Sequence, residues 1–181
     1  MTRKIILQRK RIFIAVEGEG EQSFIKFIQQ LSSQQGLHVH LDCEILKGGG
    51  YKTMLERAIR YRSRKERYKA EASILLVDAD RAEKDDGWSL EQLRAEAQKN
   101  KIDICLQTPN QEGLFLRLLP GKQHLRPNAN TAHRDLCKEW HDYQKPIDAR
   151  TLMSKFSLDD LLRVANVDKD LKLLLTKIGF H

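Results

Sequence analysis

The sequence predicts an α/β fold in which a parallel sheet is flanked by helices and followed by a helical C-terminal extension. Two runs of branched aliphatic residues, 12–16 and 73–77, are typical of strands buried on both faces of a parallel sheet. Helical patterns alternate with such runs up to about residue 107, which indicates right-handed crossovers. We expect one structural unit, with the α/β part over 1–125 and the helical extension over 126–181 packed on it.

The elements of the α/β part follow from periodicity and from turn residues. Strands are expected at about 11–16, 41–46, 73–77 and 102–107. Helices are expected between them at about 22–35, 52–69 and 90–100. In the first helix, Phe24, Phe27, Ile28 and Leu31 share one face. Gly36 is a suitable stop for that helix, and Ser89 is a suitable N-cap for the helix at 90–100.

Beyond Pro109 the pattern becomes helical. A short helix is expected at 112–119, ending at Pro120, and several helices follow from about residue 130. Breaks are expected near Pro146 and at Asn166. Ser157 with an aspartate three residues later resembles a capping box.

Composition sets limits on the class of protein. The 181 residues carry a formal net charge of +7, which makes an anionic partner plausible. The cysteines Cys43, Cys105 and Cys137 are isolated, which argues against a disulfide framework or a structural zinc site and fits the cytoplasm. No apolar segment is long enough for a signal sequence or a membrane span, so no membrane association is expected.

Carboxylates follow two of the expected strands. Glu17 comes directly after the first strand, and Asp78 and Asp80 come directly after the third. In open α/β sheets, ligands collect outside the carboxyl ends of the strands, so these acids converge if the two strands are neighbours. The Asp-x-Asp spacing puts both side chains on one side of a strand-like segment, where both can reach a hard cation such as Mg²⁺. The alternatives are an acidic helix N-terminus over residues 16–21 and a solvated turn at the aspartates.

Four motifs carry a resemblance to a known family. They are Val16-Glu17-Gly18-Glu19-Gly20-Glu21-Gln22-Ser23-Phe24, Leu76-Val77-Asp78-Ala79-Asp80-Arg81, Thr108-Pro109-Asn110-Gln111-Glu112-Gly113-Leu114-Phe115-Leu116 and Tyr143-Gln144-Lys145. Together they resemble the Toprim domain, and within it the RloB-like group, which is related to the OLD-family nucleases. The resemblance covers about residues 10 to 155.

Three positions depart from the motifs of that group. The third motif usually has an aromatic residue before its glutamate and a tryptophan two residues after it, where this chain has Gln111 and Leu114. The first motif usually has threonine before its second acid, where this chain has Gly20.

The resemblance implies roles for the matching residues. It implies that Glu17 is a metal ligand or general acid/base and that Asp78 and Asp80 bind Mg²⁺ (or Mn²⁺). Glu112 would be a further acid of the metal site with a catalytic role, and Glu21 could serve a second ion. Lys145 would contact phosphate or stabilise the transition state.

A basic stretch lies in the second predicted helix. Arg57, Arg60, Arg64 and Arg67 recur at helical spacing, with Lys52 one turn before them. They are interpreted either as a solvated face or as a stripe that binds the phosphates of nucleic acid. The preceding Gly48-Gly49-Gly50 lacks the Gly-Lys-[Ser/Thr] ending of a P-loop, so a strand–helix turn is the better interpretation, with a phosphate-contacting loop as the alternative.

These observations favour a Mg²⁺-dependent Toprim nuclease that hydrolyses phosphodiester bonds in DNA or RNA. The resemblance implies a setting in bacterial anti-phage or restriction-linked defence, beside an ATPase. The alternative is a Toprim module that binds nucleic acid or an ATPase and is active only in a larger assembly. A primase-type nucleotidyl transferase would need a template-binding module, which the chain does not visibly carry. Candidate partners are nucleic acid, an ATPase and a second copy of the chain.

Overall fold

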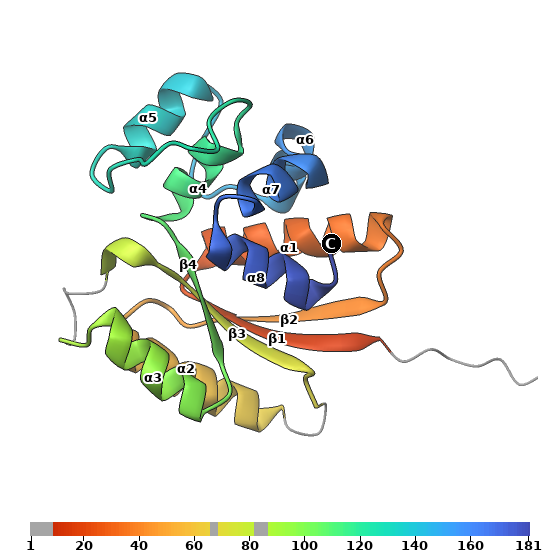
Figure 1. Ribbon diagram of the computed structural model, residues 1–181, viewed down its shortest axis with the longest axis vertical. Coiled ribbons are helices and arrows are strands. Elements are labelled where there is room, and N and C mark those ends of the chain that lie inside the picture. The colour runs from red at the N-terminus through yellow and green to blue at the C-terminus, as the bar shows by residue number, and fades with distance from the viewer. Residues whose placement is uncertain (1–8, 66–68, 82–86) are drawn as a thin grey trace, which may run out of the picture.

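The computed structural model describes residues 9–65, 69–81 and 87–181 (Figure 1). One all-parallel sheet of four strands has the order β2-β1-β3-β4. The strands are β1 (Lys10–Val16), β2 (Val39–Ile45), β3 (Ala72–Asp78) and β4 (Asp103–Gln107). The helices are α1 (Glu19–Gln34), α2 (Tyr51–Arg64), α3 (Leu90–Lys99), α4 (Gln111–Leu118), α5 (Ala132–Glu139), α6 (Ala149–Lys155), α7 (Leu158–Ala165) and α8 (Lys169–Ile178), and a 3₁₀ turn, η1, spans Ala79–Arg81.

The strand order creates a reversal in the middle of the sheet. β1 pairs with β2 on one side and with β3 on the other, and Val16 lies opposite Leu76 in the β1–β3 register. The chain leaves β1 for a helix on one face of the sheet and leaves β3 for a helix on the opposite face (Figure 1). Two strands whose connections diverge in this way leave a crevice at their carboxyl ends, which is where open α/β sheets place their ligands.

Alternation along the strands divides the core between the two faces of the sheet. Ile12, Ile14 and Val16 pack with α1 and with the helices of the C-terminal region, whereas Phe13 and Ala15 pack with α2 and α3. Both faces of the sheet are therefore covered by helices, as the aliphatic runs predict. The predicted fold class, a parallel α/β sheet with a helical C-terminal region, is confirmed.

The C-terminal helices share one core with the sheet. Phe24 of α1 and Phe115 of α4 have ring centroids 6.0 Å apart, and Phe115 lies 6.0 Å from Phe156, which follows α6. Tyr143 packs against Phe115 at 6.3 Å, and α8 lies against β4. Residues of the predicted extension thus bury the apolar face of α1 and complete the helical layer on that side of the sheet.

The start of α1 and the end of α2 differ from the predicted boundaries. α1 starts at Glu19 instead of residue 22, because the Glu21 carboxylate accepts a hydrogen bond from the Gly18 N–H at 3.0 Å and caps the first turn. α2 ends at Arg64 with Lys65 as C-cap, and residues 66–68 of the predicted range lie outside the described residues. The N-cap at Ser89 and the capping box at Ser157 are confirmed.

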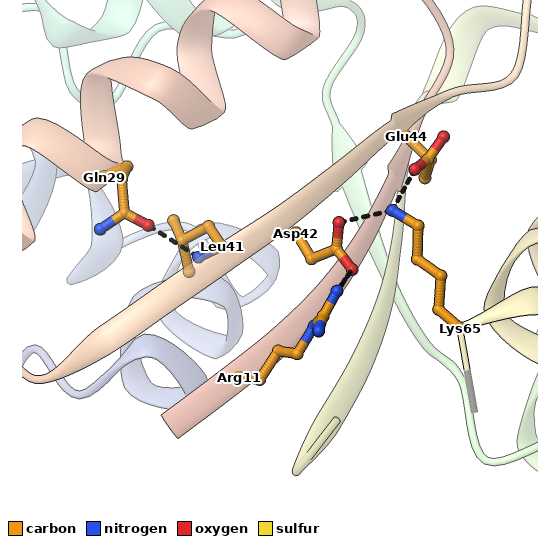
Figure 2. Close-up of polar contacts among 6 residues, drawn as sticks. All are labelled: Arg11, Gln29, Leu41, Asp42, Glu44 and Lys65. Atoms are coloured by element: carbon orange, nitrogen blue, oxygen red, sulfur yellow. Dashed lines mark hydrogen bonds and ion pairs between the residues drawn. The ribbon is translucent and has the colours of Figure 1, made fainter. Parts of the chain in front are cut away.

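A charged network joins β2, β1 and the end of α2 (Figure 2). The Asp42 carboxylate accepts hydrogen bonds from the Arg11 guanidinium, through Nε at 3.2 Å, and from Lys65 Nζ at 2.6 Å. Lys65 also pairs with Glu44, and Gln29 Oε1 accepts a hydrogen bond from the Leu41 N–H at 2.7 Å. Although burial alone would raise the pKa of Asp42, Lys65 and Arg11 hold it below its usual range.

Within the described residues, no helix is both long enough and apolar enough to cross a bilayer. The cysteines Cys43, Cys105 and Cys137 are free thiols.

Candidate functional site

A cleft of about 530 Å³ lies at the carboxyl end of the sheet, where the connections that follow β1 and β3 leave on opposite faces. Three buried or half-buried acids line it, namely Glu17, Glu21 and Asp78. Its other polar side chains are Glu19, Lys47, Gln111, Tyr143 and Lys145. The convergence expected of Glu17 and Asp78 therefore occurs, because β1 and β3 are neighbours.

Glu17 and Glu21 belong to the turn between β1 and α1. Glu17 is 8% exposed, and its backbone oxygen accepts a hydrogen bond from the Gly48 N–H at 3.2 Å. Glu21 is 9% exposed and caps α1 through Gly18. Glu21 therefore lies in an acidic helix N-terminus, which was the alternative interpretation of this segment, and it also lines the cleft.

Asp78 is the most perturbed acid of the cleft. Burial, and after it the charges of Glu21, Glu17, Asp80 and Glu112, together raise the pKa of Asp78 to about 9. Its Oδ1 atom is buried and has no hydrogen-bond partner among the described residues. The buried Tyr51 hydroxyl donates to the Asp78 backbone oxygen at 3.4 Å, and burial raises the pKa of Tyr51 to about 12.

Contrary to expectation, Asp80 does not lie on the same side of a strand-like segment as Asp78. β3 ends at Asp78, and η1 follows at once, so Asp78 and Asp80 are not alternate residues of one strand-like segment. Asp80 is exposed and accepts a hydrogen bond from Asn110 Nδ2 at 3.2 Å, while its N–H donates to the Pro109 oxygen at 3.0 Å. Asp80 therefore acts on Asp78 through its charge while it is tied to the turn after β4.

The third and fourth motifs meet at Glu112. Every residue of α4 is buried, so this helix holds Glu112 rigidly beside the end of the sheet. The Tyr143 hydroxyl donates to Glu112 Oε1 at 3.3 Å, and Lys145 forms an ion pair with the same oxygen. His133 Nδ1 lies 3.9 Å from it. Glu112 is thus paired with a cation from the chain itself.

Two of the three departures from the motifs lie against each other. A Cβ atom at Gly20 would come within 2.4 Å of Gln111 Oε1, so the glycine and the glutamine fit as a pair. Gln111 is 5% exposed, and its Nε2 has no hydrogen-bond partner among the described residues. The third departure, Leu114, is buried in the core.

The donor set of the cleft fits a hard divalent cation. Carboxylate oxygens are the ligands that Mg²⁺ and Mn²⁺ prefer, and a cation next to Asp78 would offset the like charges that raise its pKa. The buried Oδ1 of Asp78 would gain a partner. In the described part of the chain, no group of three His, Cys, Asp or Glu side chains is already close enough to hold a metal ion. Binding would therefore require side chains to rotate toward the ion.

The basic residues of α2 do not form one uniform stripe. Arg57 Nη1 donates to the backbone oxygens of Leu46 at 2.7 Å and Gly48 at 2.8 Å. Arg60 and Arg64 are exposed and stack over the Tyr61 ring at 5.5 and 5.7 Å. Lys52 is exposed in the first turn, at the cleft end of α2, and Arg67 lies outside the described residues. Arg57 thus anchors a loop, whereas Lys52, Arg60 and Arg64 remain solvent-facing cations.

Three residues near the site were not predicted to belong to it. Lys47 comes from the segment between β2 and α2, Tyr51 is the first residue of α2, and His133 comes from α5. Lys47 carried a weak signal, because it precedes the three glycines of the predicted strand–helix turn. His133 and Tyr51 approach the site only through tertiary packing, and no local pattern marks them.

Comparisons with protein-family models, with curated proteins and with solved structures found no match to this chain.

Proposed function

We propose that this chain is a Mg²⁺- or Mn²⁺-dependent nuclease of the Toprim type, similar to the RloB-like group, that hydrolyses phosphodiester bonds in the cytoplasm. The observation that carries the proposal is the cleft at the β1–β3 divergence, where the half-buried Asp78 faces Glu17 and Glu21. A protein that only needed to fold would gain stability by pairing Asp78 with a cation of its own. An uncompensated acid in a cleft is instead a mark of a functional site.

The metal would be held by Asp78, with Glu17 and Glu21 as the neighbouring oxygen ligands. A bound Mg²⁺ would polarise the phosphate and lower the pKa of a bound water. Glu17, fixed by the turn after β1, would accept the proton of the attacking water. Lys145 lines the same cleft and would contact phosphate once released from Glu112.

A second candidate function is favoured by the pairing at Glu112. Lys145 and Tyr143 both engage this carboxylate, so the acid expected to join the metal site is occupied within the chain. In a Toprim module that cleaves only within an assembly, a partner ATPase or bound nucleic acid would draw Lys145 away. Restriction-linked or anti-phage defence would be the setting of either function.

A nuclease assay with a charge-removing variant tests the proposal. Single- and double-stranded DNA and single-stranded RNA are incubated with the protein in Mg²⁺ or Mn²⁺. Glu17→Gln should lose at least roughly 100-fold in rate, the scale typical of removing a general base. Glu91→Gln, at an exposed first-turn glutamate of α3 outside the cleft, is the matched control and should cleave normally.

Equal cleavage by wild type and Glu17→Gln would contradict the proposed role of Glu17. A wild type that is inert alone but cleaves after addition of the ATPase encoded beside it would favour the second candidate function.

A further inference from the structure

Lys47 has an unusual backbone conformation for a side-chain-bearing residue. Its φ is +63°, in the left-handed region that glycine adopts without cost. Among the described residues other than glycine, only Lys101 shares this sign, at +54°. Lys101 follows the end of α3, and its N–H donates to the Gln98 oxygen at 2.9 Å, so helix termination explains it. Lys47 follows a strand, so it needs another explanation.

The surrounding structure fixes Lys47 in this conformation. Arg57 Nη1 bonds to the backbone oxygens on either side of it, at Leu46 and Gly48. The Gly48 N–H bonds to the Glu17 oxygen at 3.2 Å, which ties the loop to the end of β1. These contacts hold the loop against the turn that carries Glu17. Arg57, predicted to bind phosphate, instead serves to position this loop.

The next two positions show what the loop requires. Gly48 and Gly49 have φ values of +70° and +112°, so the turn uses glycine at both of these left-handed positions. Position 47 carries a lysine although its conformation favours glycine. Strain of this kind persists at sites where the side chain has a use.

The charge of Lys47 is not committed elsewhere. Lys47 lines the cleft, and no carboxylate lies within ion-pair distance of it in the described chain. Lys145, the other lysine of the cleft, is paired with Glu112. The buried Gln111 Nε2, on the same cleft, also has no hydrogen-bond partner among the described residues. Two groups of this acidic cleft are therefore available to a ligand, namely the charge of Lys47 and the hydrogen-bond donor Gln111 Nε2.

We infer that Lys47 contacts a phosphate of a nucleic-acid strand bound in the cleft, with the Gln111 amide as a second donor to the same backbone. The inference rests on the proposed function, because it requires a strand in this cleft. A polyanion entering among Glu17, Glu19, Glu21 and Asp78 meets repulsion that a metal ion alone would have to offset. Lys47 supplies positive charge from the loop fixed to Glu17.

Substitution by glycine separates the charge of Lys47 from its conformation. A labelled single-stranded oligonucleotide is titrated with Ca²⁺ in place of Mg²⁺, so that the strand stays bound. Lys47→Gly should weaken binding at least tenfold and reduce the slope of log affinity against log salt by about 0.7, as for one lost contact to a single strand. Its thermal midpoint should stay the same or rise, because glycine accepts the positive φ.

Lys47→Arg, which keeps the charge, should bind as wild type does. Lys101→Gly relieves the same kind of conformation outside the cleft and should also leave binding unchanged. Wild-type affinity in Lys47→Gly, or a loss as large in Lys47→Arg, would overturn the inference and leave the proposed function standing. A wild type that binds no oligonucleotide while Lys47→Gly changes nothing would remove both.

Discussion

Two aspartates of the sheet, the buried Asp42 and the half-buried Asp78, have opposite electrostatic surroundings. Asp42 lies in the middle of β2 with Arg11 and Lys65 against it, and they hold its pKa below the usual range (Figure 2). Asp78 lies at the end of β3 among other carboxylates, and burial together with those charges raises its pKa to about 9. Neighbouring cations thus compensate the charge of Asp42, whereas the groups around Asp78 leave its charge uncompensated.

The difference shows how a fold separates structural acids from functional ones. Lys65 reaches Asp42 because α2 runs antiparallel to the strands and ends beside β2. At the other end of the sheet, the turns after β1 and β3 carry acids. The compensated acid contributes to stability, whereas the uncompensated one reduces the stability of the metal-free protein and is suited to attract a cation.

The largest expected effect on stability comes from removing the charge of the compensated acid. Asp42→Asn should lower the free energy of unfolding by about 1–3 kcal/mol, because Arg11 and Lys65 lose a hydrogen-bonded carboxylate. Urea denaturation at pH 7 in the presence of EDTA measures this change. A variant as stable as wild type would show that the network in Figure 2 contributes nothing net.

The same substitution at the cleft should act with the opposite sign. Asp78→Asn should raise the free energy of unfolding of the metal-free protein by about 1 kcal/mol, within the usual span of single substitutions. The reason is that folding places the Asp78 carboxyl among Glu17, Glu21, Asp80 and Glu112 and so forces it to take up a proton at pH 7, a cost that asparagine does not have. Under the same denaturation conditions, destabilisation would mean that the Asp78 carboxylate is compensated after all.

The pH dependence should distinguish the two acids as well. The folded pKa of Asp78 is raised from 3.8 to about 9, so its favourable contribution is complete below about pH 4 and is lost as pH rises through 9. The stability advantage of Asp78→Asn should therefore grow between pH 5 and 9, by at most about 1.4 kcal/mol per pH unit. Asp42, with its lowered pKa, contributes stability above pH 3.8 that is lost on acidification.

Parallel unfolding curves of wild type and Asp78→Asn from pH 5 to 9 would refute a raised pKa for Asp78. Asp42→Asn serves as the comparison, since its deficit should stay constant over this range and shrink only in acid.

The smallest effect is expected from replacing the cations of α2 that pair with neither aspartate. Arg60 and Arg64 are exposed, whereas Lys65 forms ion pairs with Asp42 and Glu44. Replacing Arg60 and Arg64 by glutamine should reduce the salt slope of nucleic-acid binding by up to about two phosphate contacts without changing stability. An unchanged slope, measured by fluorescence anisotropy at several salt concentrations, would make this part of α2 a solvated face.

The sequence predicted features that depend on local pattern. The aliphatic runs, the helical spacing of Phe24 to Leu31 and the caps at Ser89 and Ser157 all appear in the structure. The strand order was not deducible from them, yet it decides whether Glu17 and Asp78 meet. Asp80 departed from its expected position because the chain enters η1 right after Asp78, where the alternation of a strand no longer applies.

The pairing of acids with cations was beyond sequence reasoning as well. Asp42 looked like an ordinary strand residue, and its partners lie 31 and 23 residues away in the chain. Lys145 was expected to contact phosphate, but it pairs with Glu112 in a region where Tyr143, two residues earlier, packs against Phe115, and no local pattern predicts this tertiary contact.

The central claim is that the uncompensated acid exists to bind a cation, and calorimetric titration with Mn²⁺ tests it most directly. Wild type, Asp78→Asn and Asp42→Asn are titrated under identical conditions, with stability in EDTA confirming that each is folded. We predict that wild type and Asp42→Asn bind Mn²⁺ alike and that Asp78→Asn binds at least roughly tenfold more weakly, the scale typical of a damaged metal site. Equal binding by wild type and Asp78→Asn would contradict the claim.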